Sequence, residues 1–196
     1  ERALPVGSGG LAAPLARLWA EADSQGAVVV VVTSQHSSAR AQADSVADSG
    51  AQVWAPTLQE LANEPSWKSY CQEAVEMARQ AAPKSIWLLK APEGSLPELD
   101  SDAVAARLGE LAARLVVECE AAGVVATGGD GASAVLDALG AGGIALVDEV
   151  TGGMPLGTLT GGPVAGLPVV TKAGGFGSPD VLMRAVKAVR ERRFSV

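Results

Sequence analysis

Apolar residues follow two alternating patterns along this chain. Short continuous apolar runs, of which the valine run at 27–32 is the clearest, indicate strands buried on both faces. Valine loses rotamer freedom in a helix and packs well in a parallel sheet. Longer stretches in which apolar residues recur every three or four positions indicate helices. The strands predicted in this way lie at 27–33, 51–55, 84–91, 123–126, 144–150 and 167–172.

Helical patterns fill most of the intervals between these strands. The predicted helices open near Ser8, at 37–47, 67–82, 104–115 and 132–139, and after an N-cap at Ser178. The Gly/Pro-rich stretch 151–166 is predicted as a connection with a short pairing at 157–160. Strands that alternate with helices predict an α/β fold, a mostly parallel sheet with helices on both faces in a Rossmann-like three-layer sandwich. We expect residues 1–196 to form a single domain.

Composition and charge exclude several classes of function. The formal net charge is -7, which disfavours binding to a nucleic-acid backbone. The longest apolar run is far below the roughly 20 residues that a membrane helix needs, so we expect a soluble, cytoplasmic domain without membrane contact. Cys71 and Cys119 are expected to be reduced. His36 is the single histidine, so no histidine-based metal site is predicted, and no catalytic residue can be assigned.

The glycine-rich segment 127–133 is the first candidate for binding chemistry. It follows a predicted strand and precedes a predicted helix, so the amides of Gly128, Gly129 and Gly131 could face an anion at a helix N-terminus. Asp130 could orient Mg²⁺ through water or cap the helix. The alternative is a tight strand-to-helix turn without a ligand.

Two further loops follow predicted strands. Lys172 precedes Gly174 and Gly175, an order opposite to that of a Walker loop, and could neutralise phosphate charge or be a solvated lysine. Phe176 is expected to be a packing residue. Ser34 leaves the valine strand in a hydroxyl-rich loop that could hold a phosphate or a ribose, or cap the next helix.

Taken together, these segments resemble the nucleotide-binding C-terminal domain of the four-carbon acid sugar kinase family. The resemblance covers nearly the whole chain. It rests on Gly128-Gly129-Asp130 with Ala134-Val135-Leu136, on Gly153-Met154-Pro155-Leu156-Gly157, on Leu167-Pro168-Val169-Val170 with Lys172, and on Gly174-Gly175-Phe176-Gly177. Ser8-Gly9-Gly10 and Ser34 with Arg40-Ala41-Gln42 are similar to the family's opening turn and serine loop. Two positions depart from the pattern: Gly131 replaces a usual threonine, and Thr33 replaces a usual glycine.

The resemblance implies half of an ATP-dependent kinase that transfers the γ-phosphoryl group to a four-carbon sugar acid. It implies ATP and Mg²⁺ as cofactors and Ser34, Gly128, Gly129, Asp130, Gly131 and Gly174 as ATP contacts. Its partner would be an N-terminal sugar-acid-binding domain, whose Asp-Asp-Leu-Thr-Gly-Ala segment does not occur in these 196 residues. We therefore expect the chain to bind ATP·Mg²⁺ and to be inactive alone.

Two other functions stay open at this point. Gly128-Gly129-Asp130-Gly131 is also similar to the signature of NAD and lipid kinases, although their other motifs are not evident. A non-catalytic small-molecule-binding or regulatory module is the alternative outside the kinases.

Overall fold

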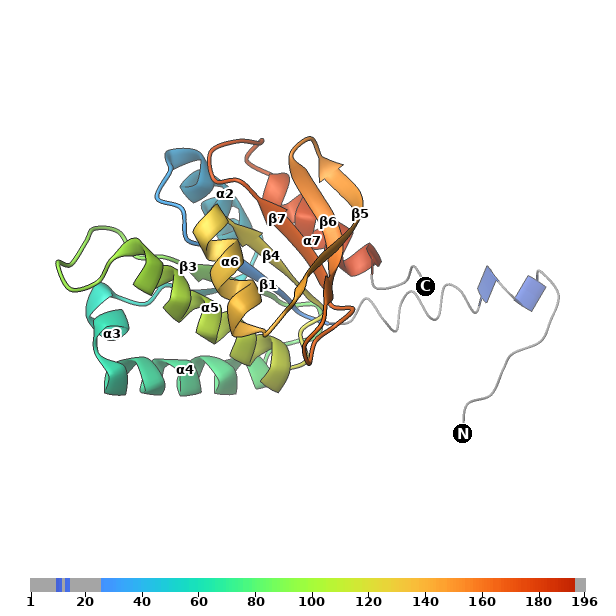
Figure 1. The fold of residues 1–196 in the computed structure, drawn as a ribbon. Helices are drawn as coiled ribbons and strands as arrows, with labels where there is room; N and C mark the ends of the chain where they lie inside the picture. Colours follow the sequence, from blue (N-terminus) through green and yellow to red (C-terminus); the bar gives the residue numbers. More distant parts are fainter. Residues whose placement is uncertain (1–9, 12, 15–25, 193–196) are drawn as a thin grey trace.

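The computed structural model describes residues 10, 11, 13, 14 and 26–192, and these form one seven-stranded sheet covered by helices on both faces (Figure 1). The strand order is β2-β3-β1-β4-β7-β6-β5. The strands β1 to β4 and β7 run parallel, whereas β6 is antiparallel to both β7 and β5. The predicted fold class, a mostly parallel α/β sandwich, is confirmed. The helix predicted to open near Ser8 lies mainly outside the described residues.

The elements alternate as the apolar pattern predicts. The strands are β1 (Val28–Val32), β2 (Gln52–Trp54), β3 (Ile86–Lys90), β4 (Gly123–Thr127), β5 (Gly143–Thr151), β6 (Met154–Thr160) and β7 (Pro168–Lys172). The helices are α2 (Ser37–Asp48), α3 (Leu58–Ala62), α4 (Glu64–Arg79), α5 (Ser101–Glu118), α6 (Gly129–Ala138) and α7 (Val181–Arg192).

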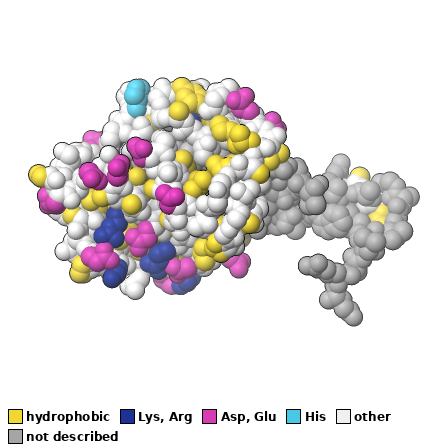
Figure 2. Space-filling view, in the orientation of Figure 1, with side chains coloured by type: hydrophobic (Ala, Val, Ile, Leu, Met, Phe, Trp, Pro, Cys, Tyr) yellow, Lys and Arg dark blue, Asp and Glu magenta, His cyan; other side chains and the backbone are white. Residues whose placement is uncertain are grey.

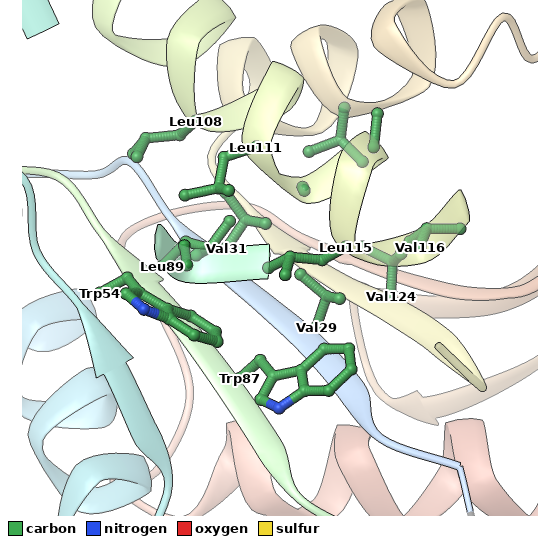
Figure 3. Close-up of a cluster of buried hydrophobic side chains, with 14 of the residues drawn as sticks. Val29, Val31, Trp54, Trp87, Leu89, Leu108, Leu111, Leu115, Val116 and Val124 are labelled. Atoms are coloured by element: carbon green, nitrogen blue, oxygen red, sulfur yellow. The ribbon is translucent and has the colours of Figure 1, made fainter. Parts of the chain in front are cut away.

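The valine strand β1 is the centre of the molecule. Each of its valines is at most 1% exposed, and successive side chains enter opposite halves of the core. Val29 and Val31 pack below Leu108, Leu111 and Leu115 of α5 (Figure 3). Val28, Val30 and Val32 belong to the other half, which α2 and α7 cover. The strand β1 is therefore buried on both faces, as its composition requires.

Besides shifts of up to three residues at the ends of elements, four features of the fold differ from the sequence predictions. The glycines 129–131 form the first turn of α6, so this helix begins earlier than residue 132. The strand β6 spans seven residues where only a short pairing at 157–160 was expected. The short helix α3 was not predicted, although its Thr57-to-Glu60 capping box is visible in the sequence. Ser178 is not an N-cap: the carbonyl of Asp180 accepts the first helical bond, from the amide of Arg184.

One face of α4 is buried and the opposite face is exposed. Met77, which is 52% exposed, does not belong to the buried face. The buried stripe consists of Trp67, Cys71, Ala74, Val75 and Ala78. Cys71 and Cys119 are free thiols, and burial raises the pKa of the Cys71 thiol to about 11.

Charged side chains of both signs mix on the face shown in Figure 2. Salt bridges such as Arg107 to Glu110 and Arg114 to Glu118 run along α5. None of the helices in the described part of the chain has the length and hydropathy needed to cross a membrane.

The strand β5 ends the sheet in the described part of the chain. Its outward surface carries Leu146, which is 68% exposed, and Val147, which is 45% exposed. The pairing of β5 with β6 shifts register between Leu146 and Asp148 and again between Glu149 and Thr151. These shifts of register and the carboxylates of Asp148 and Glu149 interrupt an otherwise regular strand edge.

Candidate functional site

The loops that follow β1, β4 and β7 meet at one edge of the sheet. The strand β4 pairs with β1 on one side and β7 on the other, so the carboxyl ends of the three strands are neighbours. Gly128 donates its amide hydrogen to the carbonyl of Lys172 at 2.9 Å, and Thr33 Oγ1 donates to the carbonyl of Thr127 at 3.1 Å. The three glycine or serine loops singled out in the sequence therefore lie together, where ligands of parallel α/β sheets bind.

The turn from β4 into α6 exposes backbone amides. Gly128 has φ +85°, a conformation that other residues rarely adopt, and it gives α6 no side-chain cap. A Cβ atom added to Gly129 would meet no atom within 4 Å, so one side of this residue is open. The uncapped amides and the dipole of α6 both favour an anion at this position.

A cavity of about 230 Å³ opens beside this turn. It lies between the ends of β4, β6 and β7. Its walls are Gly128, Gly129, Ala132, Gly153, Pro155, Thr171, Lys172 and Ala173. Gly153 and Pro155 carry no chemistry of their own, and sequence reasoning noted them only as part of a family motif.

Lys172 brings a buried positive charge to this cavity. Its side chain is 2% exposed, and its Nζ donates to the carbonyls of Ala173 at 2.9 Å and Gly174 at 3.1 Å. Burial lowers the pKa of this ammonium group. No salt bridge among the described residues involves Lys172, so carbonyl dipoles rather than a carboxylate surround its charge. The alternative prediction that Lys172 is a solvated lysine is therefore wrong.

The loop after β7 packs closely against the loop after β1. A Cβ atom on Gly174 would lie 2.7 Å from Ser34 Oγ, and one on Gly175 would lie 3.7 Å from the His36 ring. The Ser34 hydroxyl accepts a hydrogen bond from the His36 amide at 3.3 Å. The Nδ1 atom of His36 caps α2 by accepting from the Ser38 amide, so this histidine has a structural role.

Gln42 fixes the same loop from the side of α2. It is 1% exposed, and its Nε2 donates to the carbonyls of Phe176 and Gly177, each at 3.0 Å. Sequence reasoning used Gln42 only as part of a helix motif. No local signal marks it, since its partners lie more than a hundred positions away along the chain.

Asp130 faces a different part of the surface from Lys172. It is exposed in the first turn of α6 and lines a groove of about 530 Å³ between α5 and α6, together with Asp102, Ser133 and Asp137. In the described part of the chain, no group of three His, Cys, Asp or Glu side chains could hold a metal ion. Asp130 could supply a single carboxylate to a metal that other groups also bind.

The two positions that depart from the family pattern touch each other. A Cβ atom on Gly131 would overlap Thr33 Oγ1 and would lie 2.9 Å from Thr33 Cγ2. The side chain of Thr33 therefore occupies the space that a side chain at residue 131 would need. Ser8 and Gly9 of the predicted opening turn lie outside the described residues.

Known proteins are similar to this chain over most of its length. A family model described as the nucleotide-binding C-terminal domain matches residues 29–182. A D-threonate kinase of Bordetella bronchiseptica is 66% identical over 196 residues, which are 100% of this chain and 48% of that protein. A D-threonate kinase of Salmonella typhimurium is 41% identical over 85 residues, 43% of this chain and 20% of that protein.

Solved structures give the same result for the fold. A domain of unknown function from Bordetella bronchiseptica, crystallised with bound citrate as a domain-swapped dimer, has a TM-score of 0.86 and 64% sequence identity. The match covers 99% of this chain and 48% of that one. A Salmonella typhimurium protein described as a putative tRNA synthase has a TM-score of 0.64 at 20% identity, over 90% of this chain and 45% of its own, and shares the fold. This chain spans about half the length of these relatives.

Proposed function

This chain belongs to the family of nucleotide-binding C-terminal domains of four-carbon acid sugar kinases, and from that premise we propose that it binds ATP with Mg²⁺ at the ends of β1, β4 and β7. In this proposal it is the nucleotide half of a kinase that transfers the γ-phosphoryl group to a four-carbon sugar acid. The name of the 66% identical relative makes D-threonate the first acceptor to test.

The observation that carries this proposal is the cavity that Lys172 shares with the backbone of Gly128 and Gly129. A buried cation without a carboxylate partner among the described residues favours an anion beside it. Glycine backbone allows a phosphate to approach the amides closely. Phosphoryl transfer depends mainly on positioning and charge stabilisation, which amides, a lysine and Mg²⁺ can provide.

Each candidate residue has a distinct place in this proposal. The amides of Gly128, Gly129 and Gly131 would face the phosphates, and Lys172 would offset their charge while it holds the loop of Gly174 and Gly175. Ser34 lies against Gly174, and its hydroxyl hydrogen is available to a phosphate oxygen.

The residues present fit Mg²⁺ carried mainly by the nucleotide. Mg²⁺ usually takes one or two protein carboxylates, phosphate oxygens and several waters. Asp130 lies in the first turn of α6, next to Gly129, but it lines the groove between α5 and α6, so in this proposal it reaches a metal on the phosphates through water. When bound, the metal would neutralise phosphate charge.

The acceptor hydroxyl and the base that removes its proton belong, in this proposal, to the sugar-binding domain. Correct positioning of two reactants can contribute roughly 7 to 11 kcal/mol to lowering a barrier. A nucleotide half alone lacks that contribution. We therefore expect these 196 residues to bind ATP without phosphorylating a sugar acid.

Calorimetry with ATP and Mg²⁺ tests the binding, and an ADP-release assay with D-threonate and its stereoisomers tests the reaction. The assay is run with this chain alone and with the N-terminal half of the Bordetella bronchiseptica relative added. We expect saturable ATP binding, no acceptor-dependent ADP release by the chain alone, and release in the mixture. Acceptor-dependent turnover by the chain alone would refute the division of labour, and a folded chain that does not bind ATP would refute the proposed function itself.

A further inference from the structure

We propose that Thr33 is a positioning residue of the nucleotide site, whose hydroxyl holds the Thr127–Gly128 peptide and whose side chain as a whole requires glycine at residue 131. The inference rests on the proposed function, since it concerns the same glycine turn. The sequence places Thr33 in the hydroxyl-rich loop after β1, where it could contact a phosphate or a ribose, but gives it no role in the glycine turn.

The first line of evidence is the hydrogen bonding of a single peptide group. The carbonyl of Thr127 accepts from Thr33 Oγ1 at 3.1 Å, and the amide of Gly128 donates to the carbonyl of Lys172 at 2.9 Å. Thr33 follows β1 and Lys172 ends β7, the two neighbours of β4. The peptide is thereby held from both sides.

The Thr33 hydroxyl extends the pairing of two strands by one step. The last residue pair between β1 and β4 is Val32 with Thr127. Beyond it the backbone of β1 turns away, and a side chain takes the place of the next ladder bond. At this point the chain turns from β4 into α6, so the orientation of the held peptide sets the direction of the amides that follow.

The second line of evidence is the contact between Thr33 and Gly131. Thr33 Cβ and Cγ2 would lie 3.1 and 2.9 Å from a Cβ atom at residue 131, and Thr33 Oγ1 would overlap it. Real Cβ atoms essentially never approach other atoms to less than 3.0 Å. Gly131 has no side chain of its own and is buried, with the Thr33 side chain against it. The two residues thus form a matched pair, in which a side chain at one position excludes a side chain at the other.

Two single variants of Thr33 distinguish the effect of its hydroxyl group from the effect of its branched shape. Thr33→Val keeps the branched shape and removes the hydroxyl, whereas Thr33→Ser keeps the hydroxyl. We expect Thr33→Val to bind ATP·Mg²⁺ about tenfold more weakly, the effect of about one hydrogen bond, and Thr33→Ser to bind within about threefold of the parent chain. Binding is measured by calorimetry and folding by thermal unfolding of each variant.

Amide hydrogen exchange without ATP distinguishes positioning from direct contact. The Gly128 amide should exchange faster in Thr33→Val than in the parent chain, because its peptide loses one of its two anchors, and Thr33→Ser should restore slow exchange. Weaker ATP binding with unchanged Gly128 exchange would overturn the positioning role. Unchanged ATP binding in a folded Thr33→Val variant would overturn it as well.

A double-mutant cycle tests the matched pair. Gly131→Thr alone should lower the midpoint of thermal unfolding and weaken ATP binding, because two side chains compete for one space. Thr33→Gly combined with Gly131→Thr should recover most of the unfolding midpoint and most of the ATP affinity. If the losses of the two single variants simply add in the double variant, the pairing is overturned. The parent chain is the reference for the proposed function: if it binds no ATP, that function fails, whereas parent binding with an additive cycle refutes only the inference.

Discussion

The ammonium group of Lys172 lies 4.7 Å from the centroid of the Phe176 ring, within the loop that follows β7. A cation over an aromatic face is attracted by the electron density of the ring. Together with the carbonyls of Ala173 and Gly174, this contact folds the loop back over the end of its own strand. Phe176 is therefore a packing residue, as the sequence predicts, and a Cβ atom added to Gly153 would lie 3.2 Å from its ring.

Lys172→Met should weaken ATP binding by about ten- to a hundredfold, because a hydrogen bond to a charged group contributes roughly 1.5 to 3 kcal/mol. Methionine keeps most of the apolar length of lysine, so we expect the chain to remain folded. Calorimetry with ATP·Mg²⁺ measures the effect. Lys187→Met is the matched control, since that lysine is exposed on α7 and contacts only Glu191 of the same helix in its salt bridge. Equal affinities of the two variants would remove Lys172 from the site.

The lowered pKa of Lys172 has a consequence for pH dependence. Burial places its folded-state pKa below the unfolded value, so between these two pKa values the unfolded chain binds more protons. The free energy of unfolding should therefore rise with pH through that window. Below the window, the full cost of burying the Lys172 charge should destabilise the folded chain. Urea unfolding at several alkaline pH values measures the slope, and Lys172→Met should make it flatter. If Lys172→Met shows the same dependence of stability on pH as the parent chain, that dependence does not come from Lys172.

ATP binding should reverse part of this shift. Phosphates beside Lys172 favour its charged form and raise its pKa. Binding in the same pH window should then take up protons, which calorimetry in buffers of different ionisation enthalpy detects. The proton uptake should disappear in Lys172→Met, whereas uptake that persists there belongs to another group.

Gly129→Val should affect ATP binding far more than folding. A Cβ atom at this position meets nothing within 4 Å, so the fold accepts a side chain, and valine has a higher helix propensity than glycine. The same side chain would stand where a phosphate approaches the amides. Affinity should fall stepwise from glycine through Gly129→Ala to Gly129→Val, by at least about tenfold in total. A folded Gly129→Val chain with parental affinity would place the phosphates elsewhere.

Gly109→Ala should destabilise the fold although alanine favours helices. A Cβ atom on Gly109 would lie 2.6 Å from the backbone carbonyl oxygen of Ala134, where α5 packs against α6. Overpacking typically costs about 1 to 3 kcal/mol, which outweighs the propensity gain of about 1 kcal/mol in all but the mildest case. Urea unfolding measures the difference. Val117→Ala, at an exposed position of the same helix, should change the stability by less than about 0.5 kcal/mol.

The sequence predicts those parts of the fold that local patterns determine. The valines of β1 and the apolar stripe of α5 depend on burial alone, and both are found where they were expected. The strand β6 was largely missed because Pro155 and Gly157 resemble turn residues. Gly157 is in fact required by packing, since its Cβ atom would lie 2.5 Å from the Ala145 carbonyl oxygen on β5.

In the candidate site, too, local features could be predicted from the sequence and long-range contacts could not. The glycine turn after β4 is a local feature and was identified, whereas the loop anchors depend on contacts between distant segments. Gln42 reaches Phe176 across 134 positions, and Thr33 reaches Thr127 across 94. The exchange of residue types at Thr33 and Gly131 appeared as two separate departures in the sequence. Only the three-dimensional contact shows that they belong together.

The outer strand β5 is the edge at which a second copy of this domain could pair in concentrated solution. An unprotected edge of this kind offers Leu146 and Val147 to the same edge of another copy, which is the first step of aggregation. Asp148 and Glu149 oppose that step by like-charge repulsion and by the shifts of register around them.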